Sequence, residues 1–599
     1  MQLVRQQHRE SELPRAERKA ELGQAHQSHK LLTIPNFLMA ILFFVYLYAF
    51  IASLQGRWFD PRWTTDDALQ QAFVFYQVND PDLFRNDLIT EMMTQYLTPI
   101  HLWVGQAITY FTADPMMTGH WIMLIQFVGV LVFLFLAVKE LAGIAPAFFS
   151  ATWMLFARNS MQRVTGGLQR GWAPMLFAAY FYLLAKEKHK SIWILFLIGC
   201  LLHPPTTLAI AGSYWLVLLY RLLKPQTRAK TKKVALTFLI LNPIFALSAY
   251  LATKKSEDLG QMASYAQAKL MPEFSREVGR FKMVPLLDAW TEIKLFGFQA
   301  FNTSLSKASP FLESYTPHIV LGFLAALLGF SLLIKRNVFK FETFALLVAI
   351  FVTYFAARVF AFHLFVPQRY IQIPLAMFFV TFLPVAVWKL FHSSSRDFRD
   401  TSFSASRHSL FFLLLLSIFL WSSSGTGLYG DANFNKVSYF QGDVWKWVSE
   451  NTPKDAVIAG HPTHIDAVEL FGKRIGYATT ETAHPFYDKY YQEIKRRLIV
   501  SFKAHYAEDL DELVSILEPE GIDYFIFKRK EFYPEALAKA DYFEPIGTEV
   551  RQLASRDYMD YAYKKLPREV DLEKFPYMPY RDDLSVIVDV SALKSFLKQ

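Results

Sequence analysis

The chain has 599 residues, of which 53% are hydrophobic, 16% are aromatic and only 19% are charged. Soluble proteins average about 25% charged residues, so this composition excludes an ordinary soluble protein and indicates that lipid surrounds much of the chain. The net charge of +9 does not indicate nucleic-acid binding, because the basic residues gather in short loops between apolar runs, where they act as orientation signals. A single cysteine, Cys200, excludes an intrachain disulfide.

Repeated apolar runs of membrane-spanning length predict an α-helical polytopic membrane protein. Eleven spans are expected, near residues 33–54, 119–138, 143–157, 171–185, 191–203, 206–222, 234–252, 317–334, 341–362, 368–390 and 409–427. The run from Thr98 to Phe111 is expected to lie along the membrane interface. Counting it as a crossing would place the basic loop of Arg221, Lys224 and Arg228 outside, against the positive-inside rule.

The spans divide the chain into three parts. Residues 1–31 are charged and are interpreted as a cytoplasmic leader, and residues 32–427 as the transmembrane domain, with external loops at 55–118 and 253–316. An odd number of spans places the first loop and the tail on the same, external side. The tail, residues 428–599, alternates helical patterns with short β-rich runs and has no glycine-rich phosphate loop, which predicts an external α/β domain without a common nucleotide site.

The first external loop opens with an acidic segment. Asp66 and Asp67 follow the first span closely enough to be held at the outer membrane surface. A carboxylate there can act as a general base toward an acceptor hydroxyl or amine, or can hold a divalent cation, Mg or Mn, against a phosphate. The alternative is that Asp66 caps the helix that begins near Ala68. Asp87, later in the same loop, is a further candidate site residue or a turn and cap residue.

Basic side chains at the external ends of later spans suit an anionic ligand. Arg163 and Arg170 flank a Thr-Gly-Gly turn, and they bind such a ligand or else pair with first-loop acids or lipid headgroups. Arg358 lies within an apolar run, where it either binds an anion or extends to the interface. Arg369 and Tyr370 follow a helix-breaking proline, and an arginine in that setting can clamp a phosphate bidentately.

Four histidines lie near prolines or near other candidate site residues in the sequence. His203 precedes two prolines at a span end, and His363 precedes the Arg369 segment, so both are candidate site residues. For His203 the alternative is a structural hydrogen bond. His461 and His464 in the tail are of metal-ligand type, but Pro462 disfavours a regular helix between them, and a packed loop is the other interpretation.

Together these features resemble the GT-C superfamily, membrane glycosyltransferases that use polyprenyl-phosphate-linked sugars. The motifs that carry the resemblance are the early first-loop acids, the Pro-Gln-Arg-Tyr sequence at 367–370, the tail opening at 445–458, and the sequences at 165–170, 203–205 and 459–462, which are similar to an uncharacterised bacterial branch. The resemblance implies that Asp66 or Asp67 is the catalytic base or metal-binding carboxylate. It also implies that Arg369, and less directly Arg358, binds the donor phosphate. The tail lacks a Trp-Trp-Asp-type signature, so oligosaccharyltransferase activity itself is not implied.

The implied function is transfer of a sugar from a polyprenyl phosphate or diphosphate to a lipid, glycan or protein acceptor, on the external face of a bacterial cytoplasmic membrane. Two alternatives remain open: a lipid or glycan transporter, and a catalytically inactive GT-C-like scaffold. A transporter would carry acids or broken helices near mid-membrane in corresponding halves, and the sequence shows no such pair. The hypothesis requires Asp66 or Asp67 to face Arg369 across an external cavity at membrane level.

Overall fold

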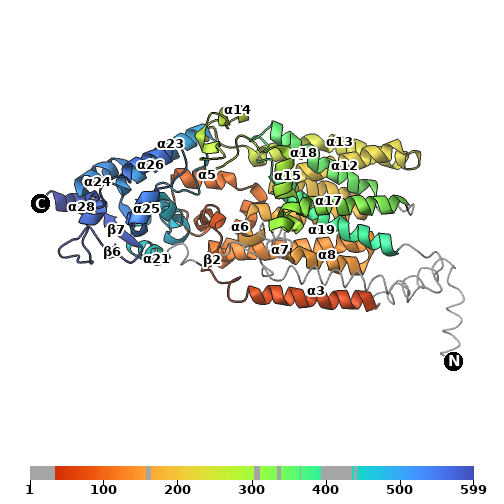
Figure 1. Ribbon diagram of the computed structural model, residues 1–599, viewed down its shortest axis with the longest axis horizontal. Helices are drawn as coiled ribbons and strands as arrows, with labels where there is room; N and C mark the ends of the chain where they lie inside the picture. The colour runs from red at the N-terminus through yellow and green to blue at the C-terminus, as the bar shows by residue number, and fades with distance from the viewer. Residues whose placement is uncertain are drawn as a thin grey trace, which may run out of the picture.

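A helical bundle and an α/β domain make up an elongated molecule (Figure 1). The computed structural model describes residues 34–156, 164–301, 310–333, 339–364, 366–392, 435–436 and 442–599. The α/β domain, blue in Figure 1, stands at one end of the bundle, which we call the domain-facing end. The expected leader at 1–31 and the expected span at 409–427 lie outside the described residues.

The apolar helices of the bundle follow the expected spans. In the described ranges they are α3 (Ile34–Ser53), α7 (Pro115–Ala142), α8 (Ile144–Phe156), α10 (Trp172–Ala185), α11 (His189–Leu202), α12 (Pro204–Leu223), α13 (Pro225–Thr253), α17 (Pro310–Leu333), α18 (Phe341–Val359) and α19 (Arg369–His392). Within these ranges seven helices, α3, α7, α12, α13, α17, α18 and α19, are long and apolar enough to cross a membrane. The chain is therefore a multi-pass membrane protein, as the composition predicts.

Helix starts in the bundle follow local sequence signals. The break between α11 and α12 falls at His203, because the two prolines that follow lack amide protons and fit only the first turn of a helix. In α7, Pro115 takes the first position, and the Asp114 carboxylate accepts a hydrogen bond of 2.8 Å from the Met116 amide. These signals set where the chain turns at the domain-facing end.

The amphipathic helix α6 (Pro99–Thr112) lies across the domain-facing end of the bundle. At its start the Thr98 hydroxyl donates a hydrogen bond of 2.8 Å to the Leu202 carbonyl, at the end of α11. Near its end the hydroxyl oxygens of Thr109 and Thr118 are 2.7 Å apart, and Thr118 belongs to the first turns of α7. Both ends of α6 therefore meet helix ends at the same side of the bundle, which agrees with an interfacial helix and not with a crossing.

The α/β domain is built on a five-stranded sheet of order β4-β3-β5-β7-β6. The strands are β3 (Val457–Gly460), β4 (Ile475–Gly476), β5 (Tyr524–Lys528), β6 (Tyr580–Arg581) and β7 (Ser585–Asp589), with helices α21 (Gly442–Asn451), α23 (Asp488–His505), α24 (Leu510–Leu517), α26 (Ile546–Leu553) and α28 (Val590–Leu597). Strand β3 runs parallel to β4 and β5, whereas β7 is antiparallel to β5 and β6. The predicted α/β character of the tail is confirmed.

The first loop, residues 55–118, shares its core with the α/β domain. Strand β1 (Trp63–Thr64) pairs antiparallel with β2 (Asn435–Lys436), which precedes the domain. Phe73 and Phe84 of the loop are buried in the same apolar cluster as Trp445 of α21. Because apolar burial is the main stabilising contribution, the domain holds the loop in place over the domain-facing end of the bundle.

Candidate functional site

A cavity of about 370 Å³ lies where the bundle, the first loop and the α/β domain meet, and its size is within the range of ligand sites. Six charged side chains line it: Asp67, Arg170, Lys255, Arg280, Arg369 and Glu481. Asp67 belongs to the first loop, Arg170 to the turn before α10, and Lys255 to the segment after α13. Arg280 belongs to the second long loop, Arg369 is the first residue of α19, and Glu481 belongs to the α/β domain. No single stretch of sequence builds this cavity.

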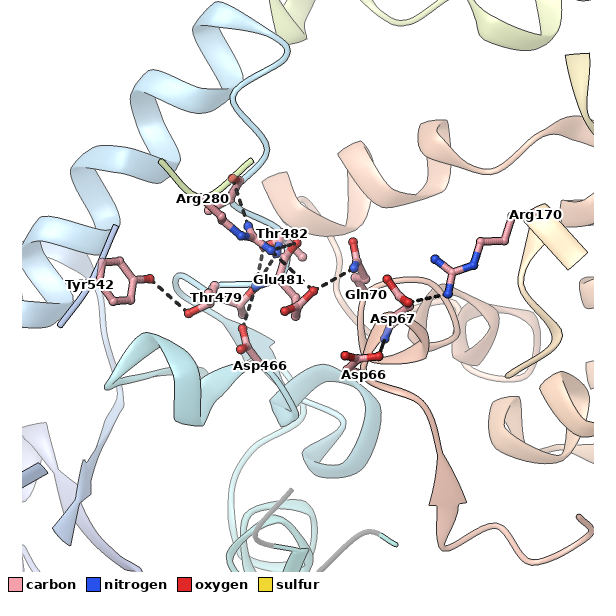
Figure 2. A network of polar contacts seen from close by, with 12 residues as sticks. Asp66, Asp67, Gln70, Arg170, Arg280, Asp466, Thr479, Glu481, Thr482 and Tyr542 are labelled. Atoms are coloured by element: carbon pink, nitrogen blue, oxygen red, sulfur yellow. Dashed lines mark hydrogen bonds and ion pairs between the residues drawn. The ribbon is translucent and has the colours of Figure 1, made fainter. Parts of the chain in front are cut away.

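The two adjacent aspartates have different surroundings (Figure 2). Both begin the short helix α4 (Asp66–Leu69), but only Asp67 lines the cavity. The Asp66 carboxylate accepts a hydrogen bond of 2.8 Å from the Asp67 amide. Asp66 is not the helix cap that the sequence suggested, because it is the first residue of α4 and Thr65 holds the cap position. The Asp67 carboxylate lies 2.5 Å from the guanidinium of Arg170. Geometry therefore distinguishes Asp67 as the cavity acid.

The turn that carries Arg170 depends on its two glycines. Gly166 and Gly167 have φ angles of +84° and +65°, in the left-handed region that glycine adopts without strain. A Cβ on Gly167 would lie 2.1 Å from the Gly119 carbonyl oxygen of α7, and one on Gly166 would lie 2.7 Å from the Thr65 hydroxyl. This close approach to α7 and to the first loop sets Arg170 beside the cavity acid.

Two cations of the cavity make no ion pair with any described residue. Arg369, at the start of α19, donates a hydrogen bond of 3.3 Å to the Gln372 side chain. Lys255, just beyond α13, donates to the Gln95 carbonyl. Burial lowers the pKa of Lys255 to about 8, so at neutral pH most of this side chain still carries its proton. The cavity thus has positive charge available for an anion such as phosphate.

The α/β domain supplies one wall of the cavity (Figure 2). The Glu481 carboxylate accepts a hydrogen bond of 3.0 Å from the Gln70 side chain and lies 3.5 Å from the Arg280 guanidinium. Burial raises the pKa of Glu481, and the nearby Asp466 carboxylate raises it further. Burial also lowers the pKa of His484 to about 3, so its ring is neutral. The domain therefore contributes an acid and a neutral imidazole to the site.

The other candidates from the sequence divide into two groups. His203, His363 and Tyr370 line the cavity, and the His203 ring nitrogen Nδ1 lies 2.9 Å from the Thr206 hydroxyl. Asp87 does not line it. It caps α5 (Leu88–Tyr96), where its carboxylate accepts bonds of 2.7 Å from both the amide and the hydroxyl of Thr90. Arg163 lies outside the described residues.

Arg358 is part of a buried ion pair away from the cavity. Its guanidinium lies 2.5 Å from the Glu292 carboxylate, whose side chain is only 7% exposed, and donates a bond of 2.7 Å to the Leu287 carbonyl. The Tyr354 hydroxyl also donates to Glu292, over 2.6 Å. This geometry fits neither expectation for Arg358, which were an anion ligand and a side chain extended to the interface. The sequence does not reveal that its partner is Glu292, in α15 (Ala289–Gly297).

We expect Arg358→Met to destabilise the fold by about 3 kcal/mol, because removing one partner leaves the other charge buried and unpaired. Thermal unfolding of the purified protein measures this loss. The double variant Arg358→Met/Glu292→Gln should recover most of it. Any activity should fall only in proportion to the folded fraction; a variant of normal stability with lost activity would place Arg358 in the functional site instead.

The expected Mg or Mn ion has no preformed ligand set in the described residues. Within them, no group of three His, Cys, Asp or Glu side chains is arranged to share a metal ion. Asp67 is paired with Arg170, as above. In the tail, His461 contacts the Thr463 hydroxyl and His464 the Ser585 hydroxyl, each over 2.9 Å, inside the domain. These contacts agree with the packed-loop interpretation of the two histidines.

Fold and site together define a multi-pass membrane protein with an α/β domain closing a charged cavity at one end of its bundle. No protein-family model and no curated protein matches the chain. The apo oligosaccharyltransferase of Archaeoglobus fulgidus is similar in structure: the match has a TM-score of 0.50 and 12% identity, and it covers 85% of this chain and 72% of that one. This likeness shows the fold alone.

Two further structures of the archaeal protein align less closely. One is a complex with Zn and sulfate, and the other is a complex with an inhibitory peptide and a dolichol-phosphate. Each has a TM-score of 0.44 and 12% identity and covers 85% of this chain, with 70% and 71% of the respective archaeal chains covered.

The sequence does not single out several of the residues that line the cavity. Lys255, Arg280, Glu481 and His484 stand in loops, outside any motif, among polar residues of ordinary composition. The one available signal is that Lys255 directly follows a membrane-length run. Their common position is a result of packing between segments that are distant in the chain.

Proposed function

We propose that the chain is a membrane glycosyltransferase that moves a sugar from a polyprenyl phosphate or diphosphate to an acceptor. One observation carries this proposal: a carboxylate, Asp67, shares a cavity at the end of the helical bundle with two cations, Arg369 and Lys255, that have no ion-pair partner among the described residues. A carboxylate can take the proton of an acceptor, and cations in the same cavity can stabilise the charge that develops on a phosphate leaving group. The oligosaccharyltransferase fold supports the same class of reaction.

In the proposed reaction the acceptor hydroxyl or amine attacks the anomeric carbon of the donor sugar. Its proton passes to the Asp67 carboxylate as the new bond forms. The bond between the anomeric carbon and the phosphate oxygen breaks, and the phosphate leaves with the electron pair. Arg369 and Lys255 stabilise the negative charge that develops on this phosphate. Arg170, beside Asp67, holds this carboxylate in place at the cavity.

The donor's lipid would enter from the bundle side of the cavity. Ala252 at the end of α13, Phe362 after α18 and Ile373 in α19 give that side an apolar lining. A long prenyl chain cannot leave the bilayer, so a site at helix ends next to apolar walls suits such a donor. The acceptor would approach from the α/β domain, past Glu481 and Arg280. Lipid, glycan and protein acceptors all remain open.

We assign the cavity and the α/β domain, residues 428–599, to the external face of a bacterial cytoplasmic membrane. The basic turn of Arg221, Lys224 and Arg228 joins α12 to α13 at the bundle end opposite the cavity. Under the positive-inside rule this end is cytoplasmic. The two expected external loops, 55–118 and 253–316, then belong to the same face as the domain.

The proposal is tested with the purified chain in lipid nanodiscs that contain a radiolabelled polyprenyl-phosphate-linked sugar pool and cell-envelope acceptors. We expect label to move from the polyprenyl fraction to an acceptor, and Asp66→Asn/Asp67→Asn to abolish this transfer. Unchanged transfer in the double variant would refute the assignment of the site. Movement of intact label across the membrane, without bond cleavage, would favour the transporter. Neither transfer nor movement would favour the inactive scaffold.

A further inference from the structure

A second cavity, of about 310 Å³, lies at the opposite end of the bundle. The end of α12, the first turns of α13 and the start of α18 form it, and its cationic side chains are Arg221, Lys224, Lys230 and Lys340. Helices α12 and α13 line the first cavity with their other ends, at Pro204 and Ala252. Because a helix of about 20 residues spans about 30 Å, the two cavities lie on opposite membrane faces.

The four basic side chains of this cavity outnumber its two carboxylates, Glu187 and Glu342, and Lys230 pairs with Glu187 over 3.8 Å. The Arg221 guanidinium lies between Glu187 and Glu342, at 2.9 and 3.1 Å, and its side chain is only 18% exposed. This arrangement neutralises much of the acidic lining. Lys224 and Lys340 make no ion pair with any described residue, so the cavity keeps positive charge that a further anion would neutralise.

The walls of the cavity are rigid. The rings of Tyr220 in α12 and Phe341 in α18 stack with centroids 3.8 Å apart and an interplanar angle of 12°. The Lys224 ammonium lies 4.2 Å from the centre of the Tyr220 ring, which holds it at the rim. The Thr227 hydroxyl donates a bond of 2.6 Å to the Arg221 carbonyl and closes the turn between α12 and α13. An anion would therefore meet a Lys224 ammonium that the Tyr220 ring already positions.

A smaller cavity of about 110 Å³ adjoins this second cavity and extends its positive lining. The two share Glu187, Arg221, Lys340 and Glu342, and the smaller one adds Lys389 of α19. Lys389 likewise makes no ion pair within the described ranges. Three lysines from three segments therefore surround a common acidic pair without being paired to it.

Apolar side chains next to the cavity face outward. Leu219 and Leu223 of α12 are 49% and 78% exposed, Leu236 of α13 is 59% exposed, and Phe344 of α18 is 46% exposed. On membrane helices such faces contact lipid tails. The cavity therefore lies at headgroup level, next to a surface that acyl chains cover.

We propose that this cavity binds a phosphate ester anion at the membrane face opposite the transfer site, with an anionic phospholipid headgroup as the source that the outward apolar faces favour. Lys224 and Lys340 contact the phosphate, and Tyr220 and Phe341 form the floor beneath it. The bound lipid joins the ends of α12, α13 and α18. This site stands independently of the proposed glycosyl transfer, because it shares no residue with the first cavity.

Native mass spectrometry of the full chain in detergent tests the site, with phosphatidylglycerol and phosphatidylcholine as probes. We expect the native chain to retain phosphatidylglycerol in preference to phosphatidylcholine. Lys224→Gln/Lys340→Gln should weaken phosphatidylglycerol binding about 25-fold, since each lysine near an anionic lipid contributes about a fivefold factor. The matched control is Lys232→Gln/Lys233→Gln, which removes the same charge from exposed positions of α13 that do not line the cavity.

A second measurement separates the two sources of phosphate. Thermal unfolding of the native chain, delipidated, is followed with inorganic phosphate and with phosphatidylglycerol. Stabilisation by the lipid alone identifies a headgroup site. Equal stabilisation by inorganic phosphate identifies a site for a soluble phosphate ester. Either result supports the anion site if the stabilisation disappears in the Lys224→Gln/Lys340→Gln variant. Retention of phosphatidylglycerol that is the same in the native chain, the cavity variant and the control would overturn the proposal, as would equal losses in both variants.

Discussion

Replacing Asp67 with asparagine is expected to lower sugar transfer about 10²- to 10⁴-fold, the range that a positioned general base contributes. Asparagine keeps the size of the side chain but cannot accept the acceptor's proton. It also removes the 2.5 Å ion pair with Arg170, so that the variant tests both the base and the local charge balance. The measurement is the transfer rate at saturating donor, together with thermal unfolding to confirm that the fold is intact.

Asp66→Asn is the matched control for this variant. It changes the neighbouring residue in the same way, but the Asp66 carboxylate contacts the Asp67 amide and does not line the cavity. We expect a modest decrease that follows stability. Asp67→Glu should retain part of the activity, because the carboxylate remains and only its reach changes. Equal losses in Asp66→Asn and Asp67→Asn would contradict the assignment of the base to Asp67 alone, and normal transfer in Asp67→Asn would refute the mechanism.

Arg369→Gln is expected to lower kcat/KM for the donor about 10²- to 10³-fold, the loss typical of removing one preorganised group that stabilises developing charge. Arg369 makes no ion pair within the described part of the chain, so its charge is available to the donor phosphate. Arg369→Lys should restore the charge but not the forked geometry, and therefore only part of the rate. Initial rates over a range of donor concentrations separate donor binding from the chemical step.

Arg276→Gln serves as the control for charge. Arg276 is exposed in the same external region and does not line the cavity, so its loss should leave transfer unchanged. A second comparison combines Arg369→Gln with Lys255→Gln, which should reduce transfer further than either change alone. Normal donor kinetics in Arg369→Gln would show that the donor phosphate lies elsewhere in the cavity or outside it.

Much of the architecture follows from local features of the sequence. Hydropathy located the described membrane helices, and the paired prolines after His203 marked the break between α11 and α12. The alternating patterns of the tail predicted an α/β domain, which the sheet of β3 to β7 and its helices confirm. Such signals are reliable because insertion in lipid, helix breaking by proline and side-chain periodicity act over neighbouring residues.

The candidate site was only partly accessible from the sequence. Asp67, Arg170 and Arg369 were candidates, and they do line one cavity. Sequence pattern could not separate Asp67 from Asp66, because adjacent residues share composition and differ only in the direction of their side chains. Nor could it show that Arg358 pairs with Glu292, 66 positions away in the chain.

The sequence by itself determined that this is a polytopic membrane protein with an α/β tail, and it nominated the acids and arginines that a phosphate-linked donor would need. Only the tertiary structure decided which of them meet. It brought Lys255, Glu481 and Arg280 to the same cavity and removed Arg358 and Asp87 from it. The physical reason is that charge, hydropathy and turn chemistry are properties of short segments, whereas a cavity is defined by packing between segments distant in the chain.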